Sequence, residues 1–220
     1  MTVQVIATAS RASASDASWH LDPLVEAAEA LDLASAAYAV RWSAAQALSS
    51  VDHERALDPL LRFGADPASD VRWQVAAGAS PAGLCLLPDE AVTVLLRLMC
   101  DPDSSVRDWA TFTLGVQSRN DTAKIRDALA DRPDDTDGNT AGEAAVGLAI
   151  RHDPRVLPVL KEKLTNLEVG NLYLEAAEEL GDPRFLPHLR QLKEQGWGID
   201  TGDAFYLDNA LQTLTEVESG

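Results

Sequence analysis

The densest group of side chains that could do chemistry is an acidic turn over residues 131–139. Its carboxylates alternate along the chain, as they do in loops that bind calcium. Such a loop also needs an acidic residue at its twelfth position, and counting from Asp131 or Asp135 reaches Gly142 or Val146 there. We therefore expect a capped turn between two helical units, with no metal.

The two cysteines, Cys85 and Cys100, lack the spacing of metal ligands. The sequence allows a disulfide between them, but two buried thiols in a reducing cytoplasm are the simpler expectation. No nucleophile elbow, phosphate-binding loop, zinc spacing or Cys/His pair is recognisable. The sequence supplies no reaction mechanism, so we expect neither an enzyme nor a cofactor.

The elements that would position any site repeat along the chain, and residues 101–114 are the clearest copy. Asp101 or Asp103 can cap the start of a helix, and Pro102 fits its first turn. Apolar or small residues then follow at helical spacing. The frame recurs every 31 to 35 residues, where the position of Arg107 is taken by Arg41, Arg72, Ala141, Tyr173 and Leu207. A period in the low thirties with two helices per unit indicates a helical solenoid.

The predicted organisation is one repeat domain over residues 19–220, preceded by a loose leader over residues 1–18. Residues 2–6 carry the one alternating, strand-like pattern. The repeat units lie near residues 34–64, 65–100, 101–133, 134–167 and 168–195, with a helix over 19–33 before them and a C-terminal cap over 203–217.

The net charge of −17 limits the class of partner. An acidic surface repels phosphate backbones, and no cluster of Lys and Arg offsets it, so we expect no nucleic acid. The sequence has no apolar run of about 18 residues, so we expect no membrane span, and no secretory signal is visible. If charge selects a partner, that partner is a basic protein, most simply in the cytoplasm.

The repeats resemble HEAT repeats, and most closely the short bacterial type called the lyase-associated HEAT-like repeat. The resemblance rests on Asp66-Pro-x-x-x-Val-Arg72, on Asp101-Pro-x-x-x-Val-Arg107 and on two Asp-Pro-Arg-x-Leu-Pro segments that start at Asp153 and Asp182. It implies an all-α, right-handed α-solenoid of about five HEAT-like helix pairs with helical caps. First helices would line the convex side and second helices the concave side.

In such arrays the Asp of the turn and the Arg after Val form a ladder of ion pairs between neighbouring units. The matching residues here are Asp66, Arg72, Asp101 and Arg107. Ala141 and Tyr173 replace the Arg in the next two units, so we expect the ladder to stop after the third unit.

Three classes of enzyme carry similar repeats, and their functional residues can be compared with this sequence. Deoxyhypusine hydroxylases carry four His-Glu pairs for two irons, whereas this chain has one, His53-Glu54. Nothing singles out the pocket of a bilin lyase. HEAT-like DNA-repair glycosylases use Trp, Asp and Arg in a cationic cleft, and the residues that superficially fit this pattern are Trp73, Arg107, Asp108 and Trp109. Packing between helices is the simpler role of Trp73 and Trp109.

The resulting hypothesis is a non-enzymatic scaffold or adaptor that binds a protein on the concave face. Its candidate partner-binding residues come from second helices, and they are Arg97, Arg126, Arg155, Arg184 and His188. One alternative is an acidic inhibitor or immunity-type binder of a basic protein. Another is a HEAT-like DNA-repair glycosylase, which the net charge disfavours.

Overall fold

A computed structural model describes residues 21–81 and 85–219. The predicted leader, the alternating residues 2–6 and residues 82–84 lie outside this range. All regular secondary structure in the described residues is helical, which confirms the all-α fold class. None of the described helices is long and apolar enough to cross a membrane. The chain forms two compact units, residues 1–120 and 121–220.

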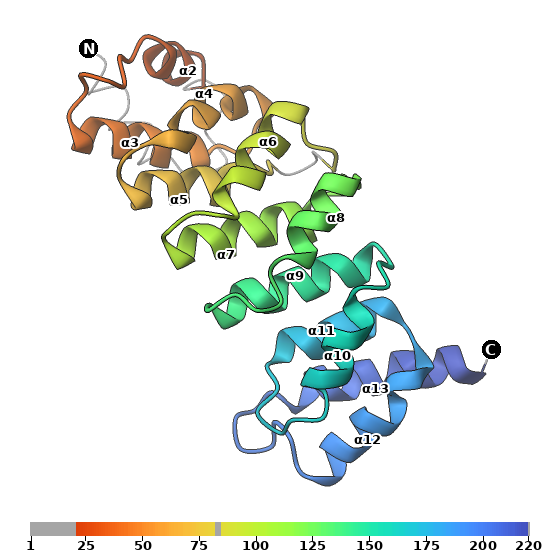
Figure 1. Cartoon of the computed structure of the whole chain (residues 1–220). Helices are drawn as coiled ribbons and strands as arrows, with labels where there is room; N and C mark the ends of the chain where they lie inside the picture. Colours follow the sequence, from red (N-terminus) through yellow and green to blue (C-terminus); the bar gives the residue numbers. More distant parts are fainter. Residues whose placement is uncertain (1–20, 82–84, 220) are drawn as a thin grey trace. The chain divides into compact units, whose positions relative to one another are not determined.

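Unit 1 is a stack of helix pairs (Figure 1). Its elements are α2 (Leu21–Glu29), α3 (Tyr38–Ser49), η2 (Glu54–Ala56), α4 (Leu57–Leu61), η3 (Arg62–Ala65), α5 (Ser69–Gly78), α6 (Asp89–Leu98), α7 (Ser104–Phe112) and the π-helical turn η4 (Thr113–Gln117). The first helices α3, α5 and α7 pack in sequence, the second helices α4 and α6 contact each other, and α2 covers α3 and α4.

The start of α7 shows how the sequence sets these helices. Asp103 caps it, since its side chain accepts a hydrogen bond from the N–H of Ser105. Val106, Ala110 and Leu114 follow at helical spacing and are fully buried. The continuation of α7 as a π-turn is held by the buried hydroxyl of Thr113, which donates to the carbonyl oxygen of Ala76 on α5 at 2.8 Å.

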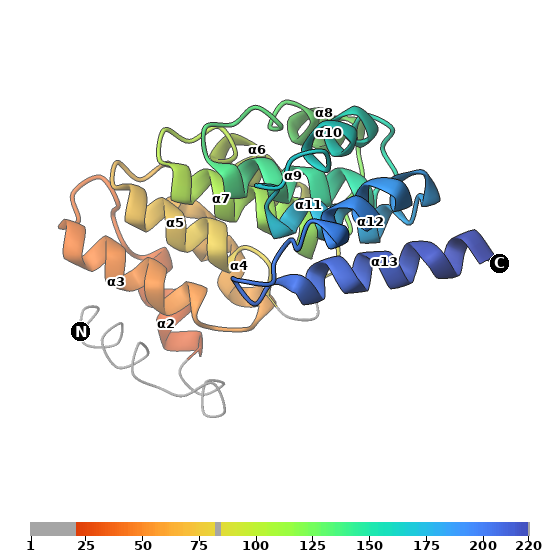
Figure 2. The same cartoon turned by 90° about the horizontal axis from the view of Figure 1, so that it is seen from below.

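Unit 2 is built in the same way, from first helices that pack in sequence and second helices that pack on them. It contains α8 (Ala123–Ala130), α9 (Gly138–Ile150), α10 (Val156–Lys163), α11 (Asn171–Leu180), η5 (Pro183–Phe185), α12 (Leu186–Glu194) and α13 (Ala204–Ser219). The helices α9, α11 and α13 pack in sequence, while α10 packs on α9 and α11 and α12 packs on α13. Figure 2 shows α13 as the long C-terminal helix of this unit.

The contact between α9 and α11 depends on a glycine. A Cβ atom added at Gly142 would lie 2.7 Å from Cβ of Leu172, which is closer than real Cβ atoms approach. The glycine therefore lets the two helix axes come together over an alanine-rich interface. Ala144, Ala145, Ala176 and Ala177 are all buried in unit 2.

One detail differs from the sequence-based prediction. Cys85 and Cys100 are exposed free thiols and not buried ones, because both lie in the connections that flank α6. The boundary between the compact units falls between η4 and α8, within the predicted repeat 101–133, so the two helices of that repeat are assigned to different units.

Candidate interaction surface

Two arginines on the first helices of unit 1 bind the next repeat. Arg41 donates from Nε and Nη2 to the carboxylate of Asp66 at 2.6 and 3.2 Å. Arg72 donates in the same way to Asp101 at 2.6 and 2.7 Å. Both pairs are largely shielded from solvent, and both join neighbouring repeats.

The same arginines also hold the turn that precedes their own helix. Nη1 of Arg41 donates to the carbonyl oxygen of Ala36 at 2.7 Å, and Nη1 of Arg72 donates to that of Asp66 at 2.7 Å. Arg107 makes the equivalent contact, from Nη1 to the carbonyl oxygen of Asp101 at 3.0 Å. Burial opposes ionisation of Asp101, but the hydrogen bonds from Arg72 and from the N–H of Asp103 leave its pKa below the ordinary value. The hydrogen bond to Asp101 raises the pKa of Arg72.

Trp73 and Trp109 pack edge to face, with ring centroids 5.5 Å apart and planes at 78°. Trp109 makes a second such contact with Phe112, at 5.7 Å. The tryptophans therefore join α5 to α7, and each is only partly exposed.

Two of the predicted partner-binding arginines, Arg126 and Arg155, belong to a network of charges on the second-helix side of unit 2. Arg126 is bidentate to Asp121, at 2.6 and 2.7 Å, and also reaches Asp153 at 3.4 Å. Arg155 is bidentate to Asp153, at 2.9 and 2.8 Å, and its Nη1 donates to Asp127 at 2.7 Å. The hydrogen bond from Arg155 is the main cause that holds the pKa of Asp153 far below its usual range.

The other predicted residues are placed differently. Arg184 folds back on Asp182, with Nε 2.9 Å from both carboxylate oxygens. His188 lies beside the ring of Phe185, with centroids 6.2 Å apart, and its buried Nδ1 has no hydrogen-bond partner among the described residues. Arg97 is exposed on α6, and no hydrogen bond or ion pair of its side chain occurs among the described residues.

These placements bring Arg126 and Arg155 together and tie Arg126, Arg155 and Arg184 to aspartates of the chain itself. The three side chains thus act first as internal partners of acidic residues.

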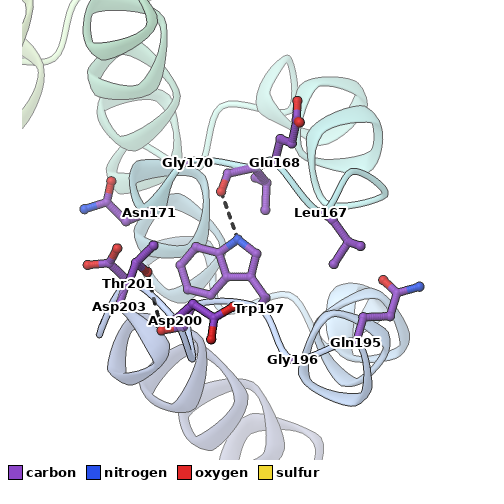
Figure 3. A pocket seen from close by; sticks show the side chains of 12 residues that line it. Leu167, Glu168, Gly170, Asn171, Gln195, Gly196, Trp197, Asp200, Thr201 and Asp203 are labelled. Carbon is purple, nitrogen blue, oxygen red and sulfur yellow. Dashed lines mark hydrogen bonds between the residues drawn. The ribbon is translucent and has the colours of Figure 1, made fainter.

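A pocket of about 510 Å³ lies in unit 2, where the connections before α11 and α13 meet. The first connection contributes residues 167–171 and the second contributes residues 195–203 except Ile199 and Gly202. Figure 3 shows the indole of Trp197 among these side chains, with Asp200, Thr201 and Asp203 on one side and Leu167 and Gln195 on the other.

The backbone holds Trp197 in this position. Its indole N–H donates to the carbonyl oxygen of Val169 at 3.0 Å, which links the two connections. Gly198 has a φ of +75°, and a Cβ atom there would lie 2.7 Å from the backbone nitrogen of Ala204. Only glycine fits this turn without strain, so the loop places the indole beside the start of α13.

The lining of the pocket is acidic and partly apolar. Glu168, Asp200 and Asp203 contribute carboxylates, and no Lys, Arg or His is among its described lining residues. Leu167, which lines the pocket, is 49% exposed, and Ile199 in the same loop is 70% exposed.

Sequence reasoning did not predict this pocket as a site. Its signal was the segment 195–203, where three glycines interrupt the helical repeat around a tryptophan. A break in a repeat can equally be a simple connection, and only the fold shows that this one meets the loop before α11.

Comparisons with known proteins match two repeats. The family model described as the PBS lyase HEAT-like repeat matches residues 40–63, which cover most of α3 and all of α4. The model of the HEAT repeat matches residues 91–116, which cover most of α6 and all of α7.

The chain is also similar to the protein YibA of Escherichia coli. It is 36% identical to YibA of strain K12 over 112 residues, and equally to YibA of strain O157:H7. Each match covers 50% of this chain and 40% of YibA, so the chain spans less than half the length of these curated relatives. The X-ray structure of E. coli YibA superposes with a TM-score of 0.68 and 24% identity over 93% of this chain and 71% of that one, which shows a shared fold.

Both matches fall on pairs of packed helices in unit 1, α3 with α4 and α6 with α7. The match at residues 91–116 contains the predicted motif Asp101-Pro-x-x-x-Val-Arg107. The chain is therefore a HEAT-repeat protein.

Proposed function

We propose that the chain is a non-enzymatic scaffold or adaptor that binds a protein partner with a basic surface. The observation that carries this proposal is that three arginines of unit 2 are bound by aspartates of the same unit. Arg126, Arg155 and Arg184 are each bidentate to an aspartate of the chain. With 35 acidic and 18 basic residues in the chain, the charge left for a partner is negative.

A stack of repeats suits this function because each helix pair adds surface beside the previous one. The surface is then extended, as recognition of a folded protein requires, and a concentrated excess of carboxylates would speed association with a basic partner. The exposed free thiols Cys85 and Cys100 are compatible with a reducing compartment, so we place this function in the cytoplasm.

A second candidate function is that of an inhibitor that covers the active surface of one basic protein. The same charge imbalance favours it. The two functions differ in stoichiometry, since a scaffold holds two partners at the same time whereas an inhibitor forms a closed complex with one.

The experiment is retention of proteins from an extract of the native cells on the immobilised full chain, washed at about 50 mM and about 500 mM NaCl. We expect basic proteins that are retained at low salt and released at high salt, because the attraction between exposed charges is screened. Calorimetry and light scattering on the purified complex then give its affinity and stoichiometry. Specific partners that are acidic, or binding that is insensitive to salt, would contradict the proposal.

A further inference from the structure

We propose that the pocket at Trp197 receives an arginine side chain of the protein partner. This inference rests on the proposed function, since it assumes that the partner is basic, and it names the place and the side chain by which that partner is held.

The first argument is the combination of an aromatic ring with carboxylates. A guanidinium group stacks on an indole face and donates paired hydrogen bonds to a carboxylate. Trp197 is partly exposed at the pocket, and its N–H is already used by Val169, so the ring is fixed while part of it stays accessible. Asp200 and Asp203 lie beside it (Figure 3).

The second argument is that no cationic side chain of the described residues is bound to these carboxylates. No hydrogen bond or ion pair of the side chains of Glu168, Asp200 or Asp203 occurs among the described residues. This contrasts with Asp153 and Asp182 in the same unit, which are bound by arginines two residues further on. A cationic side chain of a partner would therefore meet free acceptors.

The third argument is the apolar surface around the pocket. Leu167, Ile199 and Phe205 are 49%, 70% and 52% exposed, although large apolar side chains are usually covered. They belong to the two connections that form the pocket and to the first turn of α13. An anchor in a pocket surrounded by apolar contacts that exclude water is the usual arrangement of an energetic centre in an interface.

Arginine fits better than lysine. Its planar group can stack on the indole and bind a carboxylate at the same time, whereas the ammonium of lysine is a strongly hydrated point charge. A phosphate or a carboxylate ligand is disfavoured because the pocket presents three carboxylates.

The test is a titration of the full, ¹⁵N-labelled chain with N-acetyl-arginine amide at constant ionic strength, followed by NMR. The neutral N-acetyl-citrulline amide, which has nearly the same shape, is the control ligand. The indole N–H signal of Trp197 is assigned with the Trp197→Phe variant. We expect a saturable shift of this signal with a dissociation constant on the order of millimolar, and no saturable shift with the citrulline probe.

The variant Asp200→Asn/Asp203→Asn should weaken arginine binding by about tenfold or more, since it removes two of the charges while keeping side-chain shape. The matched variant Asp131→Asn/Glu179→Gln removes the same number of negative charges at exposed positions outside the pocket, and it should bind as the wild type does. Equal shifts with both probes, equal affinities of the two variants, or shifts spread over the acidic surface without Trp197 would overturn the proposal.

The outcome is separable from that of the proposed function. Recovery of a salt-sensitive basic partner without any effect of arginine on Trp197 would reject the pocket and leave the proposed function standing. Saturable arginine binding at Trp197 combined with specific partners that are all acidic would support the pocket chemistry and reject the basic-partner function.

Discussion

Arg41 and Arg72 make the same three contacts in successive repeats of unit 1. Each donates one hydrogen bond back to a carbonyl oxygen of the turn before its helix and two forward to the carboxylate of the next turn. The receiving aspartates also accept a backbone N–H two residues further on, from Ala68 or Asp103. One guanidinium therefore couples the geometry of two turns.

The first prediction concerns Arg72. Replacing it by alanine leaves the carboxylate of Asp101, a residue only 7% exposed, without its bidentate partner. Loss of one partner of a buried pair costs more than the pair contributes, so we expect Arg72→Ala to lower the free energy of unfolding by about 2–4 kcal/mol. Urea unfolding measures it.

Arg97→Ala is the matched control, because Arg97 is exposed on α6. It should change stability by less than about 0.5 kcal/mol. Equal stabilities of the two variants would show that the Arg72–Asp101 pair does not hold the repeats.

The second prediction concerns pH. The carboxylate of Asp153 has a pKa depressed by Arg155, whereas in the unfolded chain it titrates near its ordinary value of about 3.9. The folded state thus binds fewer protons than the unfolded chain. The stability that the ionised Asp153 contributes is present above about pH 4 and is lost as the pH falls through the pKa of the folded state.

In the Asp153→Asn variant, the free energy of unfolding should therefore fall less steeply between about pH 5 and pH 2.5 than in the wild type. Denaturant unfolding at each pH measures it. Asp131→Asn, at an exposed carboxylate, should keep the slope of the wild type. An unchanged slope in Asp153→Asn would mean that this network does not set the acid limit.

At the scale of elements, the third prediction follows from the close approach of α9 and α11 at Gly142. Gly142→Ala places a methyl group against Leu172, and neither helix can retreat without loosening other contacts. We expect a loss of about 1–3 kcal/mol of stability, measured by thermal or denaturant unfolding.

Gly138, the first residue of α9, is the control because a Cβ atom there meets nothing within 4 Å. Gly138→Ala should be neutral or stabilising by up to about 1 kcal/mol, since alanine restricts the unfolded chain. If Gly142→Ala were as stable as Gly138→Ala, the two helices would not be in close contact.

At the scale of the whole molecule, the net charge of −17 carries the fourth prediction. Non-specific binding to DNA comes mainly from cations that contact phosphates. We expect no binding to duplex or single-stranded DNA in fluorescence anisotropy at about 50 mM salt, where any attraction is exaggerated. Micromolar binding that is lost in Arg126→Ala/Arg155→Ala would instead favour the glycosylase alternative.

Much of the architecture was predictable from the sequence because it depends on local sequence patterns. The Asp-Pro turns, the helical spacing of apolar residues and the period of 31 to 35 residues predict stacked helix pairs, and the helices begin close to the predicted caps. Such features depend on neighbours within one or two turns, which a single sequence contains.

The candidate site depended on the tertiary structure. Asp127 and Asp153 lie 26 residues apart in the sequence, and only the fold, in which α8 and α10 both pack on α9, lets Arg155 bind both. In the same way, the loop before α11 and the loop before α13 form a pocket only after their helices pack side by side. Contacts between residues far apart in the chain depend on how whole elements pack, so residue spacing predicted the helices but not which charges would be paired and which would remain free at Trp197.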